Sequence, residues 1–190
     1  LKITVTGTRT EETVKDYAGS VDVITKDDLK YKPKSDLREV FDEIPGITTF
    51  SGVRRVVRGL PGLNNINIRG MEGDRNLFVI DGIRLPDRYE YGSYYIIGRT
   101  QYVDFSFLKS IEILKGSSSS LWGPDALGGV VSYRTLEPQD LLTDGDDSAF
   151  EVSSSVSNKN SGLVSSLKIA NQISPKLSSV IAYTYESAGD

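Results

Sequence analysis

The C-terminal part of the chain alternates between apolar and polar residues in three segments, 150–157, 163–173 and 177–185. Successive side chains of a β-strand point to opposite faces, so each segment would carry one apolar and one polar face. The two faces of the middle segment are Leu163, Leu167, Ile169 and Ile173 on one side, and Ser166, Lys168 and Gln172 on the other. We predict three antiparallel strands joined by short turns.

Two kinds of structure fit this alternation. Segments of about ten alternating residues separated by turns are typical of transmembrane β-barrels, whose apolar side chains face lipid. A soluble antiparallel sheet with one face on a core and one face in water alternates equally well. No stretch reaches the roughly 18 consecutive apolar residues of a membrane-spanning helix. Alternation alone therefore leaves both interpretations open.

Residues 1–140 have a different pattern, in which short strands and short helices mix without a βαβ repeat. Apolar runs predict strands at 20–25, 47–50, 66–69, 77–80, 111–114 and 128–133. Short helices are predicted after Thr25 and at 117–122. A longer helix is predicted after Pro33, where apolar residues recur at helical spacing at Leu37, Val40, Phe41 and Ile44. This mixture indicates an α+β fold.

Residues 1–18 contain few residues suited to a core. Only the stretch from Ile3 to Thr6 alternates like a strand, and no hairpin partner is recognisable beside it. We predict a mobile arm that carries one strand able to pair.

The composition excludes many kinds of functional site. Cysteine and histidine are absent from the 190 residues, which excludes disulfides, metal sites built from these residues, cysteine nucleophiles and Ser-His-Asp triads. Lys and Arg number 22 against 26 Asp and Glu, a net charge of −4. No overall basic field attracts nucleic acid. We expect no catalytic residue, no metal site and no nucleic-acid partner.

Five motifs follow one another along the chain. They are a helical pattern that runs into Ile44-Pro45-Gly46, then N-I-R-G at 67–70, L-F-V-I-D-G-I-R at 77–84, I-E-I-L-K-G at 111–116, and L-W-G-P-D-A-L-G-G-V-V at 121–131. In this order the motifs resemble the plug domain of TonB-dependent outer-membrane receptors. The resemblance spans most of Val5 to Thr135. It implies an α+β plug with a small mixed sheet and short helices, followed by the first antiparallel strands of a transmembrane β-barrel in the bacterial outer membrane.

This resemblance implies three parts: an N-terminal arm at 1–18, a plug at 19–142, and the start of the barrel at 143–190. About three strands cannot close a barrel, and an open sheet edge is not stable in lipid. We therefore expect that Asp190 is not the natural C-terminus and that the chain comes from a longer protein. The alternative is a soluble plug-like α+β module for binding or signalling, without a barrel.

The function implied by the resemblance is that of a gate in a transporter for an iron-containing ligand, with no catalysis and no resident cofactor. The stretch Leu1 to Gly7 is similar to the segment of these receptors that a TonB-type energy-transducing protein captures. The partner-binding residues would then be Ile3, Thr4, Val5, Thr6 and Gly7. Capture of this kind adds a strand to the partner's sheet and depends on backbone hydrogen bonds.

The end of the plug, 123–142, is similar to the haem and haemoglobin receptor branch, which places haem ahead of a ferric siderophore. The histidine that such receptors carry at the plug apex is missing here, which leaves tyrosine as the strong type of axial ligand in the plug and Met71 as a weaker candidate. The loops 51–65 and 86–102 are rich in Arg and Tyr, residues that dominate binding surfaces. The candidate ligand-binding residues are Arg54, Arg55, Arg58, Arg84, Arg88, Tyr89, Tyr91, Tyr94, Tyr95, Arg99 and Tyr102.

Two further groups of residues have structural roles in such plugs. Arg69 and Lys115 occupy positions that face acidic residues of the barrel wall and hold the plug in place; we call this the plug–barrel latch. Tight turns and close backbone approaches are expected at Gly70, Asp81, Gly82, Gly116, Gly123, Gly128 and Gly129.

Overall fold

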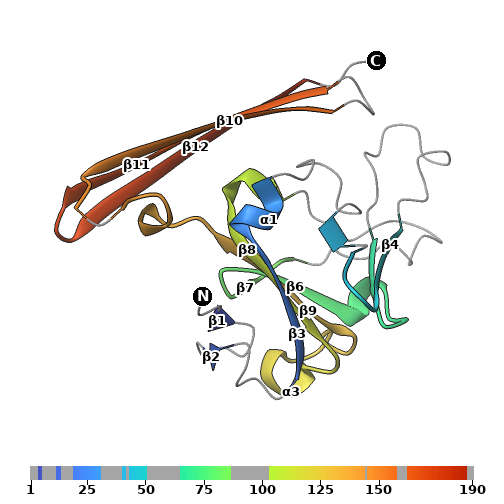
Figure 1. Cartoon of the computed structure of the whole chain (residues 1–190). Helices are drawn as coiled ribbons and strands as arrows, with labels where there is room; N and C mark the ends of the chain where they lie inside the picture. The colour runs from blue at the N-terminus through green and yellow to red at the C-terminus, as the bar shows by residue number, and fades with distance from the viewer. Residues whose placement is uncertain are drawn as a thin grey trace. The chain divides into compact units, whose positions relative to one another are not determined.

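The computed structural model describes residues 4–5, 12–13, 19–30, 40–41, 43–50, 65–86, 103–143, 145–157 and 162–187. The chain forms two compact units (Figure 1). The first unit comprises Leu1–Thr25, Asp36–Val103 and Ser110–Arg134, and the second comprises Lys26–Ser35, Asp104–Lys109 and Thr135–Asp190. Within the described ranges, no helix has the length and apolar character needed to cross a membrane.

A five-stranded mixed sheet organises the first unit, with the strand order β3-β8-β9-β6-β7. Its strands are β3 (Ser20–Thr25), β6 (Asn76–Ile80), β7 (Ile83–Arg84), β8 (Leu108–Lys115) and β9 (Gly129–Thr135). β3 is antiparallel to β8, and β6 is parallel to β9. The predicted strands are therefore confirmed. The strand predicted at 111–114 begins earlier, at Leu108, directly after the 3-10 helix η2 (Phe105–Phe107).

The core of this unit is apolar and lies against the sheet. One cluster of it comprises Leu77, Val79, Leu114, Trp122, Ala126 and Val130, with Val21 and Val23 packed against them. Trp122 is supplied by the short helix α3 (Ser119–Trp122), at the position where a helical turn was predicted.

Three of the predicted special backbone positions explain the shape of the sheet. Asp81 and Gly82 have φ angles of 47° and 80° and form the turn between β6 and β7. A Cβ on Gly129 would lie 2.3 Å from the carbonyl oxygen of Leu114, so the backbones of β8 and β9 approach too closely for a side chain. These positions confirm the predicted turn and close approach.

Two small hairpins belong to the same unit. In the first, β4 (Ile47–Phe50) pairs with β5 (Asn65–Ile68), and Ile47 lies opposite Ile68. Of the helix predicted after Pro33, the structure describes Val40 and Phe41, which are helical and buried, and Gly46 follows with a φ of 82°. In the second hairpin, β1 (Thr4–Val5) pairs with β2 (Glu12–Thr13). The prediction that the N-terminal strand lacks a hairpin partner is wrong, because two residues suffice to pair and leave no alternating pattern to recognise.

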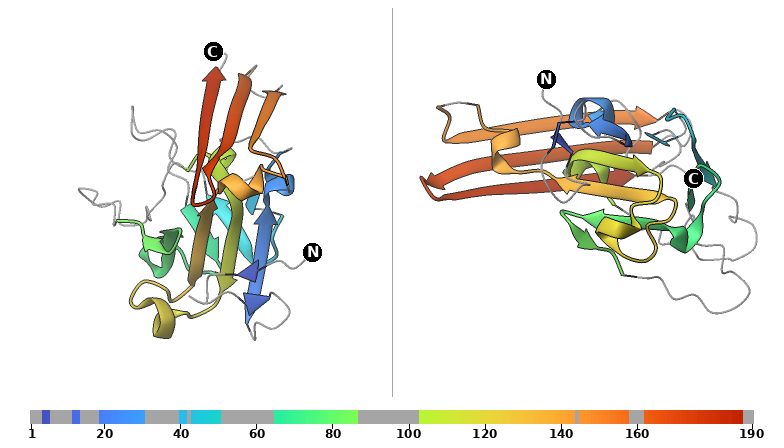
Figure 2. Two further views of the ribbon diagram at one scale, coloured as in Figure 1. Left: turned by 90° about the vertical axis from the view of Figure 1, so that its left-hand side faces the viewer. Right: turned by 90° about the horizontal axis from the view of Figure 1, so that it is seen from below.

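The second unit contains three long antiparallel strands, β10 (Ser148–Ser157), β11 (Gly162–Ser174) and β12 (Leu177–Ser187), in the order β10-β11-β12 (Figure 2). Helix α1 (Lys26–Lys30), η2 and the 3-10 helix η3 (Pro138–Asp140) belong to the same unit. η2 contacts β12, and η3 contacts both β11 and β12. The three predicted strands and the helical turn after Thr25 are confirmed.

The apolar side chains of this three-stranded sheet lie on its exposed face. Phe150, Ile169 and Ile181 are adjacent across the three strands, and they are 80%, 37% and 64% exposed. On the opposite face, Ser166 and Lys168 are buried. A soluble sheet places its apolar face on the core and its polar face in water, so the observed burial is the reverse of that arrangement.

Candidate functional site

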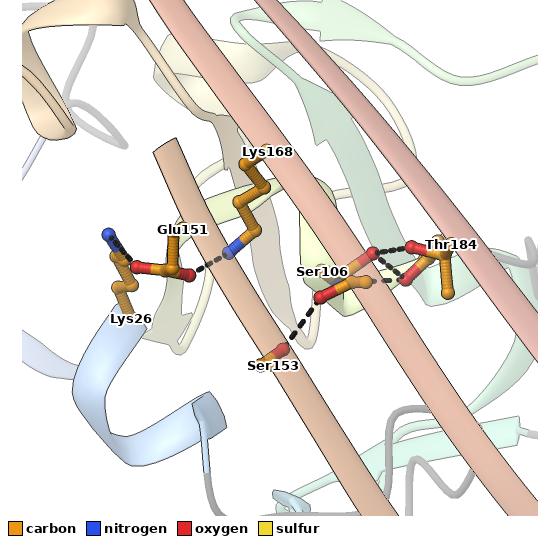
Figure 3. Close-up of polar contacts among 8 residues, drawn as sticks. Lys26, Ser106, Glu151, Ser153, Lys168 and Thr184 are labelled. Carbon is orange, nitrogen blue, oxygen red and sulfur yellow. Dashed lines mark hydrogen bonds and ion pairs between the residues drawn. The ribbon is translucent and has the colours of Figure 1, made fainter. Parts of the chain in front are cut away.

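A cluster of charged residues lies on the polar face of the three-stranded sheet (Figure 3). Glu151 of β10 lies directly opposite Lys168 of β11 in the strand register. The Nζ atom of Lys168 donates a hydrogen bond of 2.8 Å to Oε1 of Glu151. The Nζ atom of Lys26, the first residue of α1, lies 3.0 Å from Oε2 of the same carboxylate. Glu151 therefore joins a helix to two strands.

The three side chains of this cluster are buried to different degrees, and this decides how much each depends on its partner. The side chain of Lys168 is 6% exposed, that of Glu151 is 24% exposed and that of Lys26 is 27% exposed. A buried ammonium group is costly unless a carboxylate or several acceptors compensate it. Lys168 thus depends on Glu151, whereas the more exposed Lys26 depends on it less.

Hydroxyl groups extend the polar contacts beside this cluster. Ser106 of η2 shares a hydrogen bond of 2.6 Å with Thr184 of β12, and its Oγ also donates to Asp104. Ser153 and Ser166 share a hydrogen bond of 2.7 Å between β10 and β11. Charged and hydroxyl residues line a cavity of about 20 Å³ together with Leu29, Phe105 and Leu108. That volume suits a single water molecule and is far too small for haem or a siderophore.

The two predicted latch residues come together in the first unit. Arg69 follows β5 with a φ of 51°, and its guanidinium donates a hydrogen bond of 3.3 Å to the carbonyl oxygen of Lys115. The Lys115 ammonium is paired with the carboxylate of Asp22 on β3 and donates to the carbonyl oxygen of Pro45 at 3.1 Å. Lys115 is thus engaged within its own unit. Contact of either residue with a barrel wall stays a prediction.

Asp22 is a site residue that the sequence analysis missed. Its strand pairs with β8 so that Ser20 lies opposite Lys115, which puts Asp22 within reach of the ammonium group. Only the pairing of segments some ninety positions apart brings these residues together. The alternation at 20–25 predicted the strand, but it contained no signal for its neighbour.

Of the candidate ligand-binding residues, Arg84 is the one the structure describes. Its Nη2 donates 2.6 Å to the carbonyl oxygen of Pro124 and lies 3.2 Å from Oδ2 of Asp125, so it ties β7 to the loop after α3. The remaining candidates, which belong to the two Arg- and Tyr-rich loops, lie outside the described residues: Arg54, Arg55, Arg58, Arg88, Tyr89, Tyr91, Tyr94, Tyr95, Arg99 and Tyr102. Within the described part of the chain, no group of three or more carboxylates could hold a metal ion.

The predicted partner-binding segment is described at two positions. Thr4 lies opposite Thr13 and Val5 opposite Glu12 in the small N-terminal hairpin. Ile3, Thr6 and Gly7 lie outside the described residues. The segment forms a strand, as β-strand addition to a partner requires, and one of its edges is engaged by β2.

Comparison with known proteins identifies the fold. The family model of the TonB-dependent receptor plug domain matches residues 13–130. The heme/hemopexin utilization protein C of Haemophilus influenzae is 37% identical over 123 residues, which cover 64% of this chain and 15% of that protein.

Two solved structures are similar to nearly the whole chain. The hemophore receptor HasR of Serratia marcescens, determined with its hemophore HasA and heme, has a TM-score of 0.72 at 23% identity, covering 90% of this chain and 24% of that one. The siderophore receptor PirA of Acinetobacter baumannii has a TM-score of 0.66 at 25% identity, covering 91% of this chain and 25% of that one. This chain therefore spans between 15% and 25% of the length of these three proteins.

The family match covers the motifs from the I-P-G turn to the beginning of the G-G-V-V strand, and the mixed sheet built from them is the fold that those motifs predicted. The resemblance seen in the sequence is confirmed. The chain belongs to the TonB-dependent receptor plug domain family.

Proposed function

We propose that this chain is the gate of a bacterial outer-membrane transporter: a plug followed by the first strands of the barrel that surrounds it. The observation that carries this proposal is the reversed polarity of the three-stranded sheet. Its apolar face is exposed, with Phe150 80% and Ile181 64% accessible, while Lys168 is 5% exposed on the other face. Strands whose apolar side chains face lipid have this arrangement. A soluble module without a barrel would leave the same apolar face in water.

The transported ligand is an iron-containing compound, with haem ahead of a ferric siderophore. The heme/hemopexin utilization protein C, 37% identical to this chain, supports haem, and the siderophore receptor PirA, 25% identical in the structural comparison, keeps a ferric siderophore as the second candidate. Histidine is absent from these 190 residues, so any haem ligand from this part of the receptor would be a tyrosine of the 86–102 loop, which would bind the iron as a phenolate. The arginines of the same loop suit propionates and siderophore carboxylates alike.

Energy for opening the gate comes from a TonB-type partner that captures residues 3–7 by β-strand addition. The strand conformation of Thr4 and Val5 supports this role, since an extended backbone is what the partner would pair with. The capturing strand would add to the edge that β2 does not occupy, or displace β2. Nothing in this mode requires a particular side chain.

The test uses the complete receptor in its own outer membrane. Val5→Pro removes a backbone donor and fixes φ, so uptake should fall to the level of de-energised cells while ligand binding at the surface is unchanged. Thr4→Ala, which keeps the backbone donor, is the matched control and should transport normally. Normal uptake by the Val5→Pro receptor would contradict the coupling role.

The ligand is tested by titrating the purified receptor with haemin and, separately, with ferric catecholate and hydroxamate complexes. Haem binding should give a tyrosinate-type spectrum that is lost on a Tyr→Phe change at Tyr89, Tyr91, Tyr94 or Tyr95. Tight siderophore binding without any haem spectrum would contradict the preference for haem over a siderophore, and it would leave the proposed transporter function standing.

A further inference from the structure

The β4–β5 hairpin forms a small sheet of its own within the first unit. In the described part of the chain, its two strands pair with each other and with no strand of the five-stranded sheet. The stretch 51–64 joins the two strands and contains the candidate ligand-binding residues Arg54, Arg55 and Arg58. The position of this stretch therefore depends on the contacts that fix the two strands of the hairpin to the rest of the unit.

On the β5 side, the hairpin is fixed by a buried amide. Asn76, the first residue of β6, is fully buried, and its Nδ2 atom donates hydrogen bonds of 2.8 Å to the carbonyl oxygens of Ile66 and Met71. Ile66 and Ile68 of β5 are buried as well. Polar and apolar contacts together hold this strand in place.

On the β4 side, the turn at Pro45 and Gly46 is fixed by two neighbours. The Nζ atom of Lys115, the last residue of β8, donates a hydrogen bond of 3.1 Å to the carbonyl oxygen of Pro45. The backbone N–H of Arg69 donates one of 2.8 Å to the carbonyl oxygen of Gly46. Three of the five sequence motifs, I-P-G, N-I-R-G and I-E-I-L-K-G, therefore meet at the turn where the chain enters β4.

The charge of Lys115 is compensated within the same unit. Its side chain is 8% exposed, and a buried ammonium group is costly unless a carboxylate lies beside it. The carboxylate of Asp22 fills this role, and in the described part of the chain its buried Oδ2 atom accepts no other hydrogen bond. By contrast, Arg69 is exposed. Of the two predicted latch residues, Lys115 is thus turned inward.

We propose that Lys115 is a positioning residue inside the plug: it clamps the Pro45–Gly46 turn, fixes the β4 side of the hairpin and so sets the affinity of the receptor for its ligand. This assignment differs from contact with the barrel wall, the role that the family resemblance implies, and it leaves that role to Arg69. The inference rests on the proposed function, because it takes the stretch 51–64 as ligand-binding.

The first experiment measures the position of the hairpin without any ligand. The 190 residues contain no cysteine, so Thr48→Cys on β4, an exposed position, and Ile83→Cys on β7, 74% exposed, carry two spin labels in the complete receptor. Pulsed electron paramagnetic resonance should give a distance distribution that Lys115→Met broadens or shifts. Lys109→Met is the matched control, because the ion pairs of Lys109 are with carboxylates at η3 in the second unit. An unchanged distribution in Lys115→Met would overturn the clamp.

The second experiment separates positioning from stability. Lys115→Met leaves the Asp22 carboxylate without a counter-charge, so both the unfolding midpoint and the ligand affinity should fall. Adding Asp22→Asn removes that charge and should return the midpoint toward the wild-type value. The affinity should stay about tenfold lower, because the Pro45 carbonyl oxygen still lacks its charged donor. Uptake at saturating ligand should reach the wild-type rate in the double variant.

Affinities are measured by titrating the purified receptors with haemin and, separately, with ferric catecholate and hydroxamate complexes. Wild-type affinity in the double variant would overturn the positioning role. The same holds if Lys115→Met keeps its affinity but admits vancomycin into de-energised cells, since that result would place Lys115 on the barrel wall.

The outcomes distinguish this inference from the proposed function. A wild-type receptor that binds none of the three probes would overturn the proposed ligand class together with the effect on affinity, and the spin-label distances would still decide the clamp. Normal uptake by the Val5→Pro receptor would contradict the coupling role and leave Lys115 as assigned. A changed distance distribution, together with low affinity in both Lys115→Met receptors, supports the inference.

Discussion

The two units are both built on β-sheets, but they bury opposite kinds of side chain. In the first unit Leu77, Val79 and Val130 have no exposed surface, and the sheet packs around an apolar core. In the second unit the apolar side chains of the sheet are exposed, and Lys168 is buried instead. The alternation of the second unit specifies two faces of the sheet, but it does not specify which of them is covered. The surroundings of the strands determine which face is covered. In water a sheet buries its apolar face, whereas in a membrane barrel the apolar face is turned to the lipid.

The buried charge of the second unit gives the largest expected effect. Glu151→Gln leaves Lys168 without a counter-charge at 6% exposure, which should cost about 3–5 kcal/mol, the range for removing one partner of a buried pair. Lys26→Gln removes the more exposed partner and should cost at most about 1 kcal/mol. Denaturant unfolding of the two purified receptor variants compares them. Equal losses would mean that Lys168 is compensated by other groups.

A charged side chain placed on the exposed apolar face of the second unit should destabilise the receptor in the membrane. Arginine at Ile169, in the row formed with Phe150 and Ile181, should cost about 2–4 kcal/mol near the bilayer midplane and lower the yield of assembled receptor in the outer membrane. Ala182→Glu on the polar face is the control and should assemble normally, because Ala182 lies opposite Lys168, where a carboxylate adds no like charge. Ser166 does not serve as a second control, because it is 3% exposed and bonded to Ser153. Equal yields at Ile169 and Ala182 would contradict the lipid-facing assignment.

The first unit should differ from the second in its tolerance of added volume. Gly129→Ala places a Cβ within 2.3 Å of the Leu114 carbonyl oxygen, and overpacking of this kind costs about 1–3 kcal/mol. Val152→Ile adds one carbon on the exposed apolar face, where Val152 is 68% accessible, and should change the unfolding free energy by less than about 0.5 kcal/mol. Unfolding curves of both variants test the contrast. A neutral Gly129→Ala would show that β8 and β9 can separate without loss.

The sequence could predict those features that depend on residues adjacent in the chain. The strands at 20–25 and 47–50 and the Asp81-Gly82 turn were predicted to the residue, because alternation and positive-φ turn residues are properties of neighbouring positions. The five motifs, taken in their order along the chain, also indicated the family. The pairs Asp22–Lys115 and Lys26–Glu151 could not be predicted, since each joins segments that only the folded topology brings together. The binding roles assigned to the Arg and Tyr of the two loops stay predictions, as does contact of Arg69 with a barrel wall.

The smallest expected effect concerns pH and belongs to the first unit alone. Tyr133 is 2% exposed and stacks on Phe78 with ring centroids 6.5 Å apart. Burial raises the pKa of its phenol above the ordinary value of 10.0, so the folded state favours the neutral form. In the unfolded chain the phenol ionises near its ordinary pKa. The stabilisation is therefore fully present below about pH 10 and is lost above it, by at most about 1.4 kcal/mol per pH unit.

Tyr133→Phe should flatten this alkaline decline while leaving stability at neutral pH nearly unchanged. Tyr183, 64% exposed on the apolar face of the second unit, is the matched control, and Tyr183→Phe should leave the decline as it is. Denaturant unfolding of the three proteins between pH 8 and pH 11 measures the slopes. A decline that persists unchanged in Tyr133→Phe would mean that the alkaline sensitivity arises elsewhere than in the buried apolar core.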